Sequence, residues 1–285
     1  MVFTTIPAPT DTLTLDAFVA RLATHSVVDG ILLMGSTGSG KLTATSDYDV
    51  LLILADDPAA PQLVVTWVDN RITEVYCTPI SALARIVAAP TAWLEGSNEG
   101  AVINWLRDGR VVHDRVGRLA AAQEVARAAP PPPFMPPETV HGTYFALGYN
   151  VAQAKRYLSS DDPVYREAVD FRLLYSLAEV MVAYFKVRGL PWRGEKEAIK
   201  YWSTDDPAFL ADFRAYFAET DREQKVAQYE ALARRVLAPV GELWAKGTTL
   251  VGAGAGWGAA PDVPKGSTAD AHAFWRALVA PPSDG

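Results

Sequence analysis

The chain of 285 residues carries a net charge of −7, from 26 basic and 33 acidic residues, which argues against general attraction to a polyanion such as DNA. Hydrophobic residues make up 49% and charged residues 21%, a composition typical of soluble proteins, and no apolar run approaches the ~20 residues that span a bilayer. One cysteine excludes an internal disulfide, and four scattered histidines give no zinc pattern with it. The N-terminus lacks the basic and apolar regions of a signal peptide, so we expect a globular, cytoplasmic protein with no membrane partner.

The first part of the chain predicts a small mixed sheet flanked by helices. Hydrophobic periodicity indicates a helix over residues 11–27 and strands over residues 30–34, 48–54, 62–68 and 71–77. A turn rich in Gly, Ser and Thr joins the first two strands, and Asp69-Asn70 provides a turn between the last two. We therefore expect an α+β catalytic domain over residues 1–129.

A proline-rich segment, residues 130–137, follows this domain. Proline can neither continue a helix nor donate a hydrogen bond to a sheet, so the segment predicts a stiff, extended linker. Beyond it, residues 138–285 predict an α-helical bundle, because apolar residues recur at helical spacing. The expected helices cover residues 144–158, 165–187, 195–201, 207–217, 222–244 and 268–278.

Local signals mark where some of these helices begin. Asp161-Asp162-Pro163 and Asp205-Asp206-Pro207 place aspartate at the cap and proline in the first turn. The glycine-rich residues 251–258 indicate a flexible connection to the last helix.

The turn after the first strand, residues 35–42, nearly matches the phosphate-binding loop pattern of two spaced glycines followed by lysine and a hydroxyl residue. Leu42 stands where that pattern needs a magnesium-binding Ser or Thr. A polar stretch and a strand follow the turn, whereas the pattern requires a helix. We therefore favour a second pattern in the same region.

The second pattern consists of Gly35-Ser36 and, ten residues on, Asp47 and Asp49 at the start of a buried-type strand. Residues i and i+2 of a strand share a face, so the two carboxylates project together, which suits a Mg²⁺ ion that shares its shell with substrate phosphate. Glu74, inside the strand 71–77, is the candidate third carboxylate. The alternatives are a polar strand start or helix cap at Ser46, and an outward-facing Glu74 on an edge strand.

These five residues and the order of the elements resemble the nucleotidyltransferase superfamily that includes DNA polymerase β. Within it they resemble the small bacterial enzymes that modify aminoglycoside and lincosamide antibiotics, over about residues 11–115. The resemblance implies Mg²⁺-dependent transfer of a nucleoside monophosphate to a hydroxyl of a small acceptor, with release of pyrophosphate. The first expectation is AMP, transferred from ATP. Asp47 and Asp49 would hold two Mg²⁺ ions and Glu74 one of them, while Gly35 and Ser36 would contact the triphosphate.

Three cations are further candidates for contacting the nucleoside triphosphate. Lys41 lies in the Gly-Ser-rich turn, and a lysine of the helical domain commonly reaches the triphosphate in the enzymes that the chain resembles. Lys196 is the first candidate for that role and Arg193 the second, so that the helical domain would complete the nucleotide and acceptor cleft. The alternative is a solvated helix face with Glu–Lys pairs.

The acceptor site is the least specified part of this interpretation. Trp93, Glu95, Glu99 and Trp192 are possible contacts for a cationic sugar, because carboxylates and aromatic faces hold cations. Trp93 equally fits a core position and Glu95 a plain loop. The sequence identifies no general base.

Two other functions stay open at this stage. An enzyme with the same chemistry could modify tRNA or a protein, as nucleotidyltransferase toxins do. A regulatory module that keeps the fold without transferring anything is the alternative of another class, although such a module has no reason to retain a carboxylate cluster. We expect a monomer or a homodimer.

Overall fold

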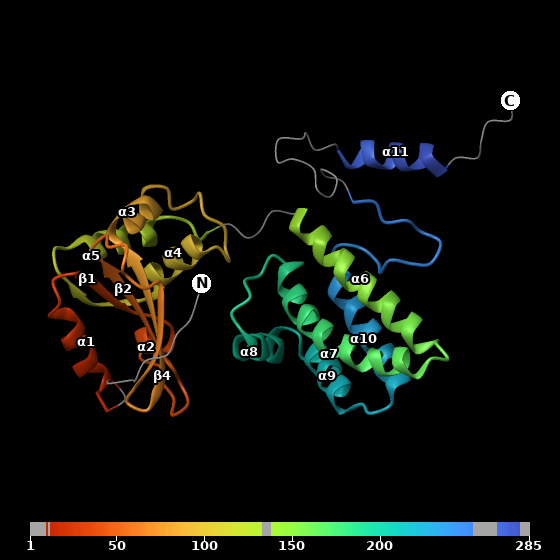
Figure 1. Cartoon of the computed structure of the whole chain (residues 1–285), viewed down its shortest axis with the longest axis horizontal. Coiled ribbons are helices and arrows are strands. Elements are labelled where there is room, and N and C mark those ends of the chain that lie inside the picture. Colours follow the sequence, from red (N-terminus) through yellow and green to blue (C-terminus); the bar gives the residue numbers. More distant parts are fainter. Residues whose placement is uncertain (1–9, 11, 133–137, 253–266, 280–285) are drawn as a thin grey trace. The chain divides into compact units, whose positions relative to one another are not determined.

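The computed structural model describes residues 10, 12–132, 138–252 and 267–279. The chain divides into two compact units, residues 1–135 and 136–285 (Figure 1). This division falls in the segment that we expect to be a linker, of which residues 133–137 lie outside the described residues. Part of the glycine-rich connection and the predicted helix start at Asp11 also lie outside them.

The first unit contains a five-stranded mixed sheet in the order β3-β4-β2-β1-β5. Only the β2–β4 pair is parallel; the other neighbours in this sheet are antiparallel. The strands are β1 (Val28–Leu33), β2 (Tyr48–Leu54), β3 (Leu63–Val68), β4 (Arg71–Pro79) and β5 (Arg110–Asp114). The α+β class expected from the sequence is confirmed.

Helices cover both faces of this sheet (Figure 1). Side chains alternate along β2, so Val50 and Leu52 pack with Phe18 of α1 (Leu15–Ala23) on one face. Leu51 and Ile53 pack on the other face against helices α3, α4 and α5. These helices are α3 (Ile80–Ala88), α4 (Asn98–Asp108) and α5 (Arg118–Ala128).

Three details of the first unit differ from the expectations. Helix α1 is shorter than residues 11–27, because the Thr14 side chain caps its start by accepting from the Ala17 amide at 3.2 Å. Strand β1 begins two residues early, since Asp29 is buried and forms an ion pair with Arg118 at 2.8 Å. Strand β5 was not expected at all, because it is short and has polar residues at both ends.

The second unit is helical, and α6, α7, α9 and α10 contribute to one apolar core. Asp162 and Asp206 cap the starts of α7 and α9, as predicted. Helix α10 ends at Leu237 and not at residue 244, because Pro239 cannot continue it, whereas α8 runs on to Asp205. The helices are α6 (Glu138–Leu158), α7 (Pro163–Lys186), α8 (Glu195–Asp205), α9 (Pro207–Ala218), α10 (Arg222–Leu237) and α11 (Thr268–Val279).

Among the helices that the structure describes, none combines the length and the apolar character needed to cross a bilayer.

Candidate active site

Three predicted acidic residues lie at one edge of the sheet in the first unit. Strands β2 and β4 run parallel, and Asp49 stands directly opposite Glu74 in their register. Opposite residues of a parallel pair share a face, with the strands about 4.8 Å apart. Asp47 immediately precedes β2, and its charge, like that of Asp49, raises the pKa of Tyr76, so it lies near the same group. All three acidic side chains are half-buried, and Asp49 and Glu74 lie on the face that α3, α4 and α5 cover further along the strands.

Gly35 lies against this acidic edge. The Met34 amide donates to the Asp49 carbonyl at 2.9 Å, which places the end of β1 beside the start of β2. Gly35 has a φ of +53°, and a Cβ atom there would lie 2.7 Å from Asp49 Oδ2. Only glycine satisfies both the left-handed backbone and this close approach.

The Gly-Ser-rich segment is partly helical, where we expected a turn. Helix α2 (Gly35–Ser39) forms one turn directly after β1 and ends at Gly40, whose φ is +71°. The Gly38 amide donates to the Met34 carbonyl at 2.7 Å, which closes the turn. No helix follows Lys41 before β2. The phosphate-binding loop pattern requires a helix at this point, so the segment does not form such a loop.

Two residues that the sequence analysis did not single out support the acidic edge. Buried Thr37 accepts from the Asp49 amide and donates to the Asp47 carbonyl, both at 3.3 Å. Arg71 Nη1 donates to the carbonyls of Thr43 and Ser46, at 2.6 and 2.7 Å, and thereby holds the segment that leads into Asp47. Neither role has a local sequence signal, because each depends on strand pairing.

Tyr76 holds the third carboxylate. Its hydroxyl donates to Glu74 Oε2 at 2.6 Å, and its ring packs 4.7 Å from the ring of Trp105. Burial and the bond to Glu74 raise the pKa of Tyr76 well above its ordinary value, and the charges of Asp49 and Asp47 add to this rise. The hydroxyl therefore stays protonated at neutral pH and remains a donor to Glu74. The i, i+2 spacing of Glu74 and Tyr76 was the available sequence signal.

The donor set fits a divalent cation that is shared with a substrate. In the described part of the chain, no group of three or more Asp, Glu, His or Cys side chains lies close enough together to hold a metal ion by itself. Mg²⁺ commonly takes only one or two carboxylates from the protein and completes its shell with water and phosphate oxygens. Asp47 and Asp49 suit that role. Burial raises the pKa of the Cys77 thiol to about 11, which makes it a poor ligand at neutral pH.

Ser36 and Lys41 also lie in the first unit, on the segment between β1 and β2. Ser36 is half-buried, and its carbonyl accepts from the Lys41 amide at 3.0 Å. The Lys41 side chain is exposed. It is therefore accessible to a ligand, and its contact with a triphosphate stays a prediction.

The predicted acceptor residues of the first unit have structural contacts of their own. Trp93 Nε1 donates to the Ile86 carbonyl at 3.1 Å, and the ring packs against the core under α3 to α5. Glu95 accepts from Asn104 at 2.7 Å, and Glu99 lies 3.4 Å from Arg85. These contacts account for the positions of the three side chains without an acceptor molecule.

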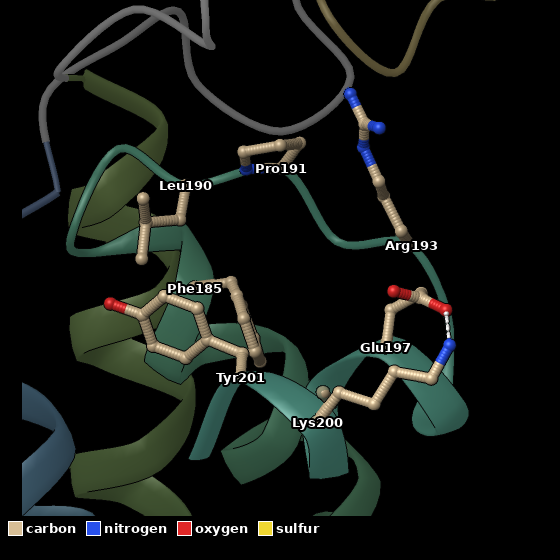
Figure 2. A pocket seen from close by; sticks show the side chains of 8 residues that line it. Phe185, Leu190, Pro191, Arg193, Glu197, Lys200 and Tyr201 are labelled. Atoms are coloured by element: carbon tan, nitrogen blue, oxygen red, sulfur yellow. Dashed lines mark hydrogen bonds and ion pairs between the residues drawn. The ribbon is translucent and has the colours of Figure 1, made fainter. Parts of the chain in front are cut away.

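The predicted cations of the second unit lie at the start of α8, next to a pocket of about 310 Å³ (Figure 2). Phe185, Leu190 and Tyr201 line this pocket, and Arg193 extends from its rim. Lys196 is exposed and does not line it. Lys200 forms an ion pair with Glu197 at 2.6 Å, the Glu–Lys pairing that we considered as the alternative. Trp192 packs against Phe185, with ring centroids 5.6 Å apart.

The chain matches no known protein-family model and no curated protein. Among solved structures, it is similar to a nucleotidyltransferase-like protein from Exiguobacterium sibiricum 255-15. The TM-score is 0.40 and the sequence identity 12%, over 78% of this chain and 73% of that one. A functional role for this chain therefore depends on the geometry of the acidic edge.

Two glycine substitutions test the close approach of Gly35 to Asp49. Gly35→Ala and Gly40→Ala should each lower the free energy of unfolding by about 1–2 kcal/mol, because both positions have positive φ. Only Gly35→Ala should also displace the Asp49 carboxylate, since a Cβ at Gly40 meets nothing within 4 Å. If Asp49 takes part in the Mg²⁺-dependent triphosphate binding proposed below, that binding should weaken at least ~10-fold in Gly35→Ala alone, measured by calorimetry beside urea unfolding. Equal binding by both variants would contradict this placement of Asp49.

Proposed function

We propose that this protein is a Mg²⁺-dependent nucleotidyltransferase that moves a nucleoside monophosphate, AMP from ATP in the first instance, to a hydroxyl of a small acceptor such as an aminoglycoside. The observation that carries the proposal is the pairing of Asp49 with Glu74 across parallel strands, with Asp47 immediately before the strand that holds Asp49. Carboxylates that lie close together repel one another, and a cation bound between them removes this repulsion.

In this reaction the acceptor hydroxyl loses its proton to solvent, its oxygen forms a bond to the α-phosphorus, and the bond from the α-phosphorus to the bridging oxygen of pyrophosphate breaks. Bound Mg²⁺ supplies positive charge that stabilises the attacking and leaving oxygens. Asp47 and Asp49 would hold the cation, and Glu74, whose carboxylate accepts from the Tyr76 hydroxyl, would be the ligand on the acceptor side. The missing side chain of Gly35 makes room for the Asp49 carboxylate, and a glycine backbone can approach a phosphate closely.

The first test needs no knowledge of the acceptor. We expect calorimetric titration with ATP, GTP, CTP and UTP to show binding of at least one triphosphate that requires Mg²⁺. The same binding should disappear in the Asp47→Asn, Asp49→Asn double variant, because two neutral amides bind a hard dication much more weakly than two carboxylates. Circular dichroism of the variant serves as the folding control.

Either outcome is informative. Mg²⁺-dependent binding justifies screening acceptors by mass, first aminoglycosides and then tRNA. Failure of every triphosphate to bind, with and without aminoglycoside present, would overturn the proposal and favour a module without transfer activity. The variants Lys41→Ala, Arg193→Ala and Lys196→Ala then show which of the three exposed cations contributes to triphosphate affinity.

A further inference from the structure

Helix α7 presents apolar side chains on the side away from the core as well as towards it. Its core side buries Val169, Leu173, Leu177 and Val180. Its outer side presents a second row, which we call the α7 seam: Val164, Ala168, Phe171, Tyr175, Ala178 and Val182. A helix that is apolar on two opposite sides is normally buried on both.

The spacing along the α7 seam indicates what covers it. Successive members are separated by four, three, four, three and four positions, the alternation that defines a heptad repeat. A sustained heptad row packs against another helix through interdigitating side chains, with no need for a polar ligand. The α7 seam is therefore suited to packing against another helix.

Exposed apolar side chains extend the α7 seam on both flanks. Phe145 and Tyr149 of α6 are exposed and stack on each other, with ring centroids 5.5 Å apart. A groove of about 440 Å³ between α6 and α7 is lined partly by small residues, including Gly142 and Ala146. Leu174, on the other flank, is 75% exposed. The small residues allow a helix to approach closely.

A polar network fixes the base of the α7 seam. The Arg172 guanidinium donates to Asn150 Oδ1 at 2.7 Å, and Asn150 in turn donates to Glu179 at 2.6 Å. The same guanidinium lies 6.0 Å and 5.6 Å from the ring centroids of Tyr149 and Tyr175. Side chains held in this way lose little freedom on binding, and Tyr and Arg are enriched in interface hot spots.

The exposed aromatic area on α6 and α7 is already comparable to a large surface patch. With about 150–250 Å² for each aromatic side chain, the exposed fractions of Phe145, Tyr149, Phe171 and Tyr175 correspond to roughly 300–500 Å². Val164, Leu174 and Val182 are also exposed and add to this area. The largest apolar patch on a typical monomer measures about 300–600 Å², and a standard interface takes about 800 Å² from each partner. The apolar side chains on α6 and α7 therefore supply a large part of the area that an interface needs.

We propose that the α7 seam is the interface of a homodimer in which the seams of two copies pack against each other. In a two-fold dimer each copy contributes the same patch, so the patch has to be complementary to itself. An apolar heptad row meets that condition, because its own repeat supplies both the projecting side chains and the spaces that receive them. This inference does not depend on the proposed transferase activity.

A matched pair of substitutions tests the dimer. Phe171 and Phe217 are 65% and 64% exposed on two helices of the second unit, but only Phe171 belongs to the α7 seam. By light scattering and sedimentation at micromolar concentration, the wild-type chain should have twice the monomer mass of 30.8 kDa. Phe171→Glu should weaken dimerisation at least ~100-fold, since each interface acquires two buried charges. Phe217→Glu should remain dimeric.

Cross-linking keeps the test decisive if Phe171→Glu does not fold. In a Cys77→Ser background, we expect Tyr175→Cys to form an intermolecular disulfide on mild oxidation, whereas Val116→Cys, at an exposed position of the first unit, should not. A monomeric wild-type chain would overturn the proposal, and so would a dimer that Phe171→Glu leaves intact. Protection of Tyr175→Cys from alkylation within a monomer would instead assign the seam to a segment of the same chain, such as α11, whose Phe274 and Leu278 are exposed.

Discussion

Asparagine in place of Asp49 should lower the rate of the proposed nucleotidyl transfer by on the order of 10³-fold while leaving the protein folded. The substitution preserves the size of the side chain and removes its charge. The backbone of Asp49 keeps its bonds to Met34 and Thr37, since neither involves the carboxylate. We expect the loss in the rate constant at saturating triphosphate and Mg²⁺, measured by pyrophosphate release with an acceptor identified in the mass screen.

The matched control for this variant is Asp57→Asn, just beyond the other end of β2. Asp57 is exposed, and its Oδ1 accepts from the Ala59 amide at 2.8 Å, a bond that asparagine can also accept. This variant should retain wild-type transfer. If Asp49→Asn and Asp57→Asn were equally active, Asp49 would have no part in the chemistry.

Alanine in place of Trp202 should lower the free energy of unfolding of the second unit by about 3–5 kcal/mol. Trp202 is 1% exposed, and its ring centroid lies 5.1–5.6 Å from four aromatic rings of the bundle core. These rings belong to Tyr184, Phe185, Phe209 and Phe213. The indole N–H of Trp202 has no hydrogen-bond partner within the described residues, so the loss comes from the cavity alone.

Urea unfolding followed by circular dichroism measures this loss. The helical signal of the second unit should disappear at lower urea, while the sheet of the first unit keeps its own transition, because Trp202 packs only within the second core. Trp67→Ala is the control: Trp67 lies on β3 and is 50% exposed, so its removal should cost less than about 1 kcal/mol. Equal losses in the two variants would contradict the described core.

The parts of the fold that follow a local pattern could be predicted from the sequence. The starts of α7 and α9 depend on Asp162 and Asp206 within four residues of chain, and the structure confirms both. The beginning of β1 could not be predicted, because buried Asp29 is compensated by Arg118, which lies 89 positions away. A charged residue at the start of a strand usually indicates that its side chain is exposed to solvent. It can be assigned to the interior only if its distant charge partner is known.

The candidate site divides in the same way. Asp47 and Asp49 share a face by their i, i+2 spacing, which is a local property. Their relation to Glu74 depends on β2 pairing with β4 in parallel, and no residue near either strand specifies that pairing. The role of Thr37 could not be predicted for the same reason, since it exists only once the strands are assembled, whereas the bond of Tyr76 to Glu74 follows from their local i, i+2 spacing.

Asp47 and Asp49 are anchored in different ways, and this difference affects which segments of the chain can change in sequence. Asp49 lies within the central ladder, bonded to β1 and paired with β4. Asp47 follows the exposed residues 41–45, which Arg71 holds through the carbonyls of Thr43 and Ser46. Exposed loops tolerate insertion and substitution far better than central strands. Descendants of this sequence can therefore alter the loop before Asp47 while Asp49 keeps its position in the sheet.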